Sequence, residues 1–343
     1  MAEALIVAPL ARMKAIVYET YGPPEVLELR DVPMPVPGEH EVLIRIRAAT
    51  VSSADWRARS LEMPPGFGLF GRPAFGLRRP RRPILGTELA GDIVSVGRAV
   101  TGFVVGDPVF AFPGARLGCH AEFRCMRADD AMALKPAALT YAQAAALSFG
   151  GATMLDFFRR AALRAGEHVL VNGSSGTVGT AAVQLAKHFG AQVTAVCSTA
   201  NVALVRSIGA DQVIDYSQED FVQSGTRYDL IVDTVGNAPF ARCGPALATG
   251  GRLVVILGGL AELLKAPWVG WTSDKKVIAG PASERPEYLH TLRELAESGR
   301  FTPVIDRTYP LAEARAAHAY VAQGRKRGSV VLTMGAAGAD AVA

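Results

Sequence analysis

The run Val169-Leu-Val-Asn-Gly-Ser-Ser-Gly-Thr-Val-Gly179 decides the fold of this 343-residue chain. An apolar strand pattern leads into Gly173, Gly176 and Gly179, and a helical pattern follows at residues 177–189. In such a turn the first glycine permits a tight bend, the second lets backbone amides approach a pyrophosphate, and the third lets the helix pack on the strand. The amino end of the helix attracts the same anion. The run therefore predicts a dinucleotide site built from Gly173, Ser174, Ser175, Gly176, Thr177, Val178 and Gly179.

Strand and helix patterns alternate around this turn. Strands are expected at 168–172, 192–197, 212–214, 229–233, 252–257 and 276–279, with helices at 177–189 and 201–208 between the first three. This alternation predicts a parallel, doubly wound sheet with right-handed crossovers. A glycine-rich turn without a ligand is the other interpretation of the run, but the strand that follows about twenty residues later favours the dinucleotide.

The rest of the chain is β-rich before this unit and mixed after it. Short strand patterns at 15–18, 26–30, 41–48, 91–97 and 106–111 suggest a small barrel or two packed sheets. The proline-rich residues 32–38 predict an extended connector. A helix is expected at 142–147, and after the sheet come helices at 285–298 and 311–323. A last strand at 329–333 is expected to return to the first domain.

Composition excludes several classes of protein. Hydrophobic residues make up 50% and charged residues 20% of the chain, the net charge is +4, and four cysteines form no paired framework. The longest apolar stretch, 253–264, is too short to span a bilayer, which needs about 20 residues. The first twelve residues lack a signal-peptide pattern. Disordered, collagenous, membrane and disulfide-scaffold proteins are excluded, and we expect a cytoplasmic protein without a membrane partner.

The end of the second strand indicates which nicotinamide cofactor is preferred. The stretch Cys197-Ser198-Thr199-Ala200-Asn201 carries no carboxylate for the two ribose hydroxyls of NAD. Its hydroxyls and amide can donate to a 2′-phosphate, with help from Tyr216 or Arg206, so the sequence favours NADPH over NADH. The alternative is that Ser198 and Thr199 only cap the helix that follows.

With these residues in view, the chain resembles the zinc-independent, quinone-oxidoreductase-like branch of the medium-chain dehydrogenase/reductase superfamily. The motifs that carry the resemblance, besides the glycine turn, are Tyr21-Gly-Pro-Pro-Glu-Val-Leu27, Glu41-Val-Leu-Ile44, Ile84-Leu-Gly-Thr-Glu-Leu-Ala-Gly91, Gly106-Asp-Pro-Val-Phe110, Gly209-Ala-Asp211, Asp233-Thr-Val-Gly236 and Arg327-Gly-Ser-Val-Val-Leu332. The resemblance implies an α/β protein in which a Rossmann-type doubly wound parallel sheet is inserted into a GroES-like β-rich domain. It implies an extension at 1–12, GroES-like segments at 13–147 and 284–334, a Rossmann domain at 148–283, and a flexible tail at 335–343.

The resemblance also assigns the site. The three zinc ligands of zinc-dependent relatives correspond here to Ser52, Thr87 and Phe149, so no zinc is expected. The catalytic candidates are Ser52, Thr87, Asp55 and Trp56, and no residue stands out as a proton donor. Beyond the glycine turn, the implied cofactor contacts are Thr153, Ser198, Thr199, Asn201, Tyr216, Val235, Gly236, Leu257, Gly258 and Arg327.

The implied activity is NADPH-dependent hydride transfer to a conjugated carbonyl, either a quinone or an α,β-unsaturated ketone. The alternatives are an NADPH-dependent alcohol or ketone dehydrogenase of the same superfamily and a non-enzymatic NADPH-binding protein of the crystallin or RNA-binding type. Nucleic acid is not an expected partner, because a +4 chain offers no broad basic face. A homodimer is expected, formed through the edge of the cofactor-domain sheet near 252–257 if that run lies at or near the edge.

Two stretches depart from the family pattern. For Cys119-His120 we expect a buried, inert cysteine and a histidine facing the cleft or solvent; a two-ligand metal site is the alternative, and adjacent strand positions do not meet as a nucleophile pair. Residues 63–82 form an insertion rich in glycine, aromatic residues and arginine. It is either a lid whose terminal arginines (Arg78, Arg79, Arg81 and Arg82) grip an anionic group, or a solvated basic loop.

Overall fold

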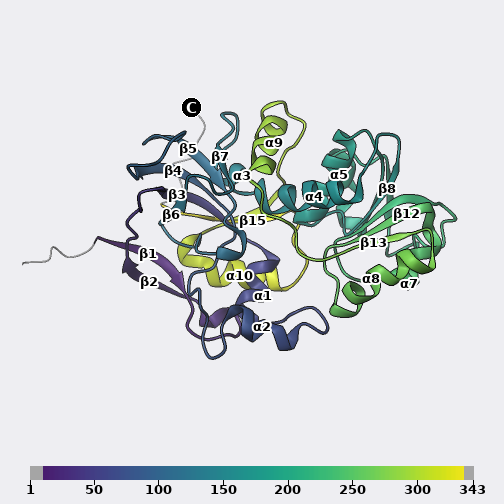
Figure 1. Ribbon diagram of the computed structural model, residues 1–343, viewed down its shortest axis with the longest axis horizontal. Helices are drawn as coiled ribbons and strands as arrows, with labels where there is room; N and C mark the ends of the chain where they lie inside the picture. The colour runs from purple at the N-terminus through teal and green to yellow at the C-terminus, as the bar shows by residue number, and fades with distance from the viewer. Residues whose placement is uncertain (1–10, 336–343) are drawn as a thin grey trace, which may run out of the picture.

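Two large β-sheets organise the chain, one toward each end of the molecule in Figure 1. The structure is a computed structural model that describes residues 11–335. The expected N-terminal extension and C-terminal tail therefore lie almost wholly outside the described residues. Arg12, assigned to the extension, is the first residue of a strand.

The cofactor-domain sheet has six strands in the order β10-β9-β8-β11-β12-β13, and every neighbouring pair is parallel. The strands are β8 (His168–Asn172), β9 (Gln192–Cys197), β10 (Gln212–Asp215), β11 (Tyr228–Asp233), β12 (Leu247–Val255) and β13 (Lys276–Ile278). Numbered within this unit, the order is 3-2-1-4-5-6, which confirms the predicted doubly wound sheet. The order reverses between β8 and β11, so a ligand is expected at the carboxyl ends of these two strands.

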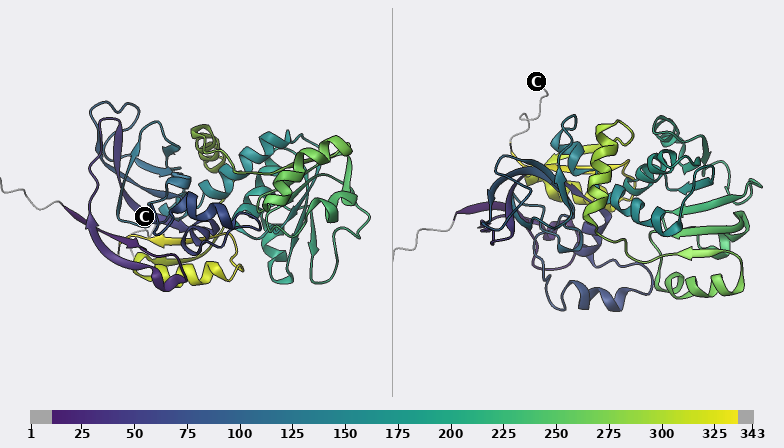
Figure 2. Two further views of the ribbon diagram at one scale, coloured as in Figure 1. Left: turned by 60° about the horizontal axis from the view of Figure 1, so that its bottom comes forward. Right: turned by 45° about the horizontal axis from the view of Figure 1, so that its top comes forward.

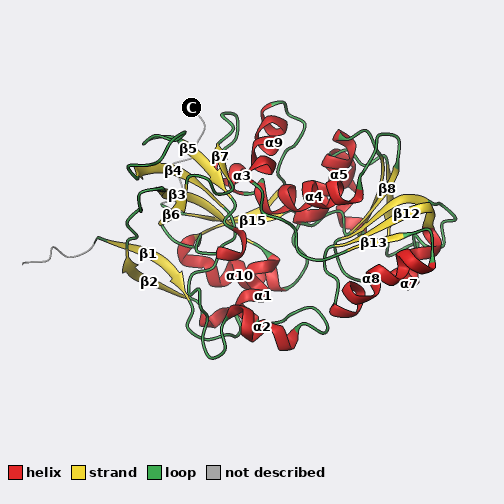
Figure 3. Cartoon of the chain, in the orientation of Figure 1, coloured by secondary structure: helices red, strands yellow, loops and turns green. Residues whose placement is uncertain are grey.

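Both faces of this sheet are covered, which explains why its strands are continuous apolar runs. Val169 and Val171 pack into the cluster that includes α4 (Ser148–Ala161) and α5 (Thr177–His188), whereas Leu170 packs into the cluster on the other face. The same alternation holds in β11, where Leu230 and Val232 face one cluster and Ile231 the other. Figure 3 shows α5 and α7 (Phe240–Cys243) on opposite sides of the sheet.

The second large sheet is mainly antiparallel and has the order β14-β15-β3-β4-β5-β7, with β6 paired to β3. Its strands are β3 (Glu41–Val51), β4 (Leu89–Val96), β5 (Pro108–Ala111), β6 (Phe123–Arg127), β7 (Met132–Leu134), β14 (Ile305–Pro310) and β15 (Ser329–Thr333). β15 pairs with β3, so the last strand does return to the first domain as expected. A separate antiparallel pair joins β1 (Arg12–Val17) to β2 (Glu28–Pro33), which takes up the first two residues of the proline-rich connector.

Ten α-helices lie within the described residues: α1 (Ser53–Ser60), α2 (Gly68–Phe75), α3 (Tyr141–Ala145), α4 (Ser148–Ala161), α5 (Thr177–His188), α6 (Val202–Ser207), α7 (Phe240–Cys243), α8 (Leu260–Thr272), α9 (Pro286–Glu297) and α10 (Ala314–Ala322). The expected helix at 311–323 begins as a 3-10 turn, Leu311–Glu313. None of the helices within 11–335 is long and apolar enough to cross a bilayer.

The β12–α8 region lies near the edge of the cofactor-domain sheet. Residues 253–255 of the apolar run end β12, which is one strand in from the edge strand β13, so the run is near the edge and not at it. The sequence reasoning also missed α8, because the helix starts after Gly258 and Gly259 and carries Pro267 inside it. Its apolar residues Leu264, Trp268 and Trp271 follow a helical spacing, but no residue of α8 is buried, so this face does not pack on the core.

Candidate active site

A cleft of about 1070 Å³ runs from the glycine turn to α1. The sequence-predicted residues that line it are Trp56, Gly173, Ser175, Gly176, Thr177, Val178, Gly179, Ser198, Asn201, Tyr216, Val235, Leu257 and Arg327. Predicted residues that do not line it are Ser52, Asp55, Thr87, Thr153, Ser174, Thr199, Gly236 and Gly258. Sequence reasoning missed several lining residues, notably Arg57, Asn172, Asn237, Arg242, Arg325 and Lys326.

The glycine turn has the geometry that an anion site needs. Gly173 has φ +81°, a conformation that favours glycine, and Gly176 is the residue before α5. A Cβ added at Gly179 would lie 2.1 Å from the carbonyl oxygen of Gly173, so only glycine lets α5 pack this closely on the turn. The free amides of the first turn of α5 therefore face the cleft with the positive end of the helix dipole.

Ser174 supports the turn and does not face the ligand space. It is fully buried, and its Oγ donates to the carbonyl oxygen of Val196 at 2.9 Å. This bond ties the turn to the end of β9. The backbone amide of Ser174 donates to the same oxygen at 3.0 Å, so both hydrogen-bond donors of Ser174 already have a partner within the protein.

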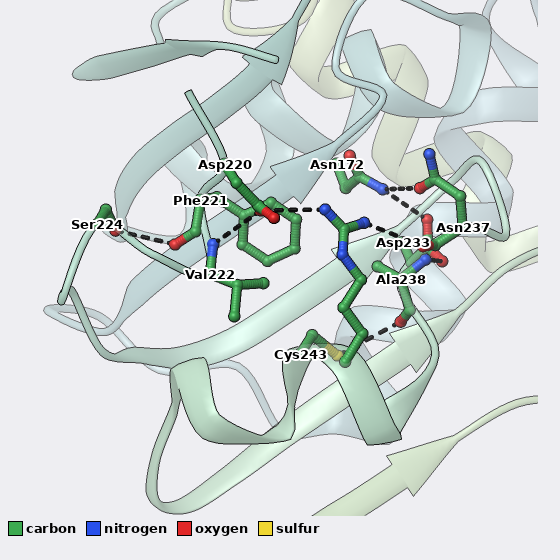
Figure 4. Close-up of polar contacts among 10 residues, drawn as sticks. Asn172, Asp220, Phe221, Val222, Ser224, Asp233, Asn237, Ala238 and Cys243 are labelled. Carbon is green, nitrogen blue, oxygen red and sulfur yellow. Dashed lines mark hydrogen bonds and ion pairs between the residues drawn. The ribbon is translucent and has the colours of Figure 1, made fainter. Parts of the chain in front are cut away.

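The carboxyl ends of β8 and β11 are joined by a buried polar network (Figure 4). Asn172 donates through Nδ2 to Asp233 Oδ1 at 2.9 Å and to Asn237 Oδ1 at 2.7 Å. Asp233 also accepts from three backbone amides, those of Val235, Gly236 and Ala238, at 2.9–3.1 Å. Asp233 is 1% exposed, and its satisfied carboxylate fixes the loop that forms one wall of the cleft.

The end of β9 presents its predicted polar residues unequally. Asn201 Nδ2 donates to Ser175 Oγ and to Ser198 Oγ, both at 3.1 Å, so these three polar groups cluster at the cleft. Ser198 precedes the 3-10 turn Thr199–Asn201, but its side chain makes no capping hydrogen bond. Thr199 instead donates to Asp215 Oδ2 at 2.5 Å and does not line the cleft. Of the two helpers considered, Tyr216 lines the cleft and Arg206 does not.

Another wall of the cleft comes from residues 321–328, which we call the return segment. It lies about 150 residues after the glycine turn in the chain. Gly328 N donates to the carbonyl oxygen of Ser175 at 2.8 Å, and Thr177 Oγ1 donates to that of Gly328 at 2.7 Å. Lys326 Nζ donates to Thr177 Oγ1 and, at 2.7 Å, to the carbonyl oxygen of Gly328. Burial lowers the pKa of Lys326 to about 8, and the charge of Glu88 acts in the opposite direction. Lys326 thus adds a cation at the amino end of α5, where the sequence analysis named only Arg327.

The predicted catalytic corner is assembled, but it lies behind the cleft wall. Ser52 Oγ donates to Asp55 Oδ2 at 2.6 Å and lies 3.3 Å from Thr87 Oγ1. Asp55 Oδ1 accepts from Gly86 N at 2.7 Å, and Ser52 and Asp55 form a capping box at the start of α1. Only Trp56 of the predicted catalytic set lines the cleft. Ser52 and Asp55 are therefore positioning residues for α1.

Glu88 ties this corner to the cofactor domain. It accepts from Thr50 Oγ1 through Oε1 and from Phe149 N through Oε2, each at 2.5 Å. Burial raises its pKa to about 7, although both hydrogen bonds oppose that change. Phe149 lines the cleft, so Glu88 holds this aromatic side chain against the cleft from behind.

The residues at the zinc-ligand positions do not fit a catalytic zinc. Ser52 and Thr87 offer hydroxyl groups, and Phe149 offers a phenyl ring, whereas zinc takes thiolate, imidazole or carboxylate ligands. Within 11–335, no three residues among histidine, cysteine, aspartate and glutamate gather as a metal site.

The structure corrects the expectation for His120. Its ring is fully buried and faces neither the cleft nor solvent; Nε2 lies 2.9 Å from the carbonyl oxygen of Thr50. The ring packs edge-on against His318, with 5.4 Å between centroids. Cys119 is buried as expected, and burial raises the pKa of its thiol to about 12. The sequence analysis treated Cys119 and His120 as adjacent positions of a strand, but neither residue lies on a strand.

The insertion reaches across to the cofactor domain. Leu260 N, at the start of α8, donates to the carbonyl oxygen of Pro65 at 2.9 Å. Figure 2 shows the segment around α2 extending toward α8 in both views. We call residues 62–67 the strap. The four arginines at the end of the insertion do not line the cleft, so they are not placed to grip a ligand there.

Comparisons with known proteins show which family the chain resembles. Two family models match the chain: an alcohol dehydrogenase GroES-like domain at residues 38–153, and a zinc-binding dehydrogenase at residues 208–332. A 2-methylene-furan-3-one reductase from Solanum lycopersicum is 33% identical over 94% of this chain and 79% of its own length. An NADPH-dependent alkenal/one oxidoreductase from Arabidopsis thaliana, a chloroplastic protein, is 31% identical over 93% of this chain and 79% of its own length.

The fold has solved counterparts as well. The structure of the quinone oxidoreductase from Coxiella burnetii superposes with a TM-score of 0.84 at 29% identity. The match covers 94% of this chain and 99% of that chain. It confirms the expected architecture over nearly the whole sequence.

Proposed function

The chain belongs to the medium-chain dehydrogenase/reductase superfamily, and on that premise we propose that it is an NADPH-dependent, zinc-independent reductase of conjugated carbonyl compounds. The observation that carries the proposal is one cleft in which a dinucleotide-binding turn faces an aromatic wall that offers no zinc ligands. The names of two relatives support the substrate class, because one reduces a methylene-furanone and the other an alkenal or enone.

NADPH is the proposed cofactor because of the groups around the glycine turn. Ser198, Asn201 and Tyr216 offer neutral donors for a 2′-phosphate, and the end of β9 itself carries no carboxylate. Glu219 and Asp220 also line the cleft, and Asp220 is paired with Arg242. The amides of α5 and the ammonium of Lys326 face the place of the pyrophosphate. When bound, the nicotinamide ring supplies the hydride.

The residues of this chain orient the acceptor. Trp56 and Phe149 provide a flat apolar wall for a conjugated ring or chain. Ser53 lines the cleft at the first position of α1, where a backbone amide has no acceptor within the helix, so this amide can donate to a developing enolate oxygen. A conjugated acceptor suits this arrangement, because its negative charge is spread over several atoms. A simple ketone needs a stronger electrophile, such as a metal ion.

The activity test uses chelator-treated protein mixed with NADPH and a panel of quinones and enones, with a saturated ketone as the control substrate. We expect absorbance loss at the NADPH band with conjugated acceptors only, unchanged by the chelator. Loss of activity that added zinc restores would contradict zinc independence. Turnover of the saturated ketone alone would instead identify an alcohol or ketone dehydrogenase.

Cofactor preference is tested by Ser198→Asp, which places a carboxylate beside the proposed 2′-phosphate site. We expect NADPH to lose at least about tenfold in kcat/KM relative to NADH, because like charges repel in a half-buried site. Ser207→Asp, an exposed position on α6 outside the cleft, is the matched control. If the ratio of kcat/KM for NADPH to kcat/KM for NADH is the same in Ser198→Asp as in wild type, the 2′-phosphate of NADPH does not bind beside Ser198.

A second copy of the chain is the partner we propose, seated on the sheet edge formed by β13. Beside this edge, α8 exposes Leu264, Trp268 and Trp271, which are 60–86% accessible, and unpaired strand edges and apolar patches favour association. Sedimentation velocity should give a species of twice 36.2 kDa. Trp271→Glu should shift it to monomer, with the exposed-site variant Tyr216→Glu as control. A monomeric wild-type protein would overturn this proposal.

A further inference from the structure

Arg57 is a cation of the cleft that the proposed hydride-transfer reaction does not use. It lies in the last turn of α1 and lines the cleft together with its neighbour Trp56 and with Phe149. Its guanidinium lies 5.5 Å from the centroid of the Trp56 ring, so the charge is held against the aromatic wall. A neutral quinone or enone carries no negative charge that could pair with this guanidinium.

The charge of Arg57 has no anionic partner in the described part of the chain. Its Nε is buried without a hydrogen-bond partner, and no ion pair within 4.0 Å joins it to a carboxylate of residues 11–335. Burial lowers its pKa, and the more distant Glu62 only partly opposes this. A desolvated guanidinium is costly without a partner and forms strong bidentate contacts with carboxylate or phosphate.

Two other cations of the cleft already have partners, and Arg325 and Arg327, which also line it, are exposed to solvent. Arg242 pairs with Asp220 at 3.0 Å, and Lys326 donates to Thr177 and Gly328 beside the glycine turn. Arg57 differs because it combines a place in the cleft wall with a buried, unsatisfied donor.

The position of Arg57 separates it from the adenosine half of the cofactor site. The 2′-phosphate candidates stand at the end of β9, whereas the strap that follows α1 contacts Leu260, just after the end of β12. β9 and β12 are separated by β8 and β11 in the sheet. Arg57 lies against Trp56 in the cleft wall formed by α1, and we assign this wall to the end of the cleft that is left for substrate.

We infer that Arg57 binds an anionic group of the substrate, a carboxylate or a phosphate, carried by the conjugated carbonyl compound. This inference rests on the proposed function and narrows it. The acceptor lies along Trp56 and Phe149, and its anionic end meets the guanidinium near the strap. Neutral quinones and enones of similar size then remain substrates, but they lack this contact.

The test compares two matched substrate pairs. The carboxylate arm uses trans-4-oxo-2-pentenoate and its methyl ester, and the phosphate arm uses crotonyl-CoA and crotonyl-pantetheine. Wild type, Arg57→Gln and Arg57→Lys are compared with Arg78→Gln, which removes the same charge from an exposed position outside the cleft. Melting temperatures confirm that each variant is folded.

In at least one arm, wild type should prefer the anionic member by about tenfold to a hundredfold in kcat/KM, the usual range for a charge-assisted hydrogen bond. Arg57→Gln should abolish that preference. It should leave kcat/KM for the neutral member and KM for NADPH within about twofold of wild type, because neither ligand makes the proposed contact. Arg57→Lys should recover part of it, because an ammonium keeps the charge and loses the planar fork. Arg78→Gln should behave as wild type.

Equal use of the anionic and neutral members by wild type in both arms would overturn the inference and leave the proposed reductase activity standing. A rise in KM for NADPH in Arg57→Gln, equal for all substrates, would assign the residue to the cofactor and also overturn it. If no acceptor is reduced, isothermal titration calorimetry in the presence of NADP measures the binding of 4-oxopentanoate and of its methyl ester, and so tests the anion site without turnover. Binding of the acid alone, lost in Arg57→Gln, supports the anion site independently of turnover; no charge preference overturns it.

Discussion

The contact between Gly328 and the glycine turn is the constraint on which the cleft depends. It joins the return segment to the start of α5 through two hydrogen bonds, Gly328 N to Ser175 and Thr177 Oγ1 to Gly328. Gly328 has φ +68°, and a Cβ there would lie 2.2 Å from the carbonyl oxygen of Val304. No residue with a Cβ fits this position unless the backbone at Val304, just before β14, moves. The cofactor site is therefore completed by a segment that belongs to the other sheet.

This arrangement divides the positive charge of the cleft between two tasks. Lys326, placed by the Gly328 contact, supplements the amino end of α5 for the proposed pyrophosphate. Arg57, placed by the capped helix α1, stands at the end of the cleft nearest the strap. The buried carboxylates Asp55, Glu88 and Asp233 each accept backbone amide hydrogens, so they fix the walls of the cleft, and none of them forms an ion pair with Lys326 or Arg57.

Sequence alone predicted the features that depend on local constraints. The glycine turn is set by backbone geometry, and the strands of the cofactor sheet are recognisable because both faces are buried. Features that depend on distant contacts were missed or misassigned. Lys326, not only Arg327, faces the turn because Gly328 fixes the register of that loop against Ser175. Thr199 turns away from the cleft because its hydroxyl donates a hydrogen bond to Asp215, at the end of the next strand. His120 is buried because it packs on His318 from α10, nearly 200 residues later.

The affinity of NADP for wild type and for Lys326→Met, measured by calorimetry from pH 6 to 9, tests the central claim most directly. At pH 7 we expect the variant to bind at least about tenfold more weakly, because it loses a charge-assisted contact at the amino end of α5. Wild-type affinity should also fall as the pH rises through about 8, where the free Lys326 loses its proton, and the variant should not follow. Arg164→Met, an exposed position outside the cleft, should match wild type. Equal affinity in Lys326→Met and wild type, or no binding by wild type, would contradict a cofactor site closed by the return segment.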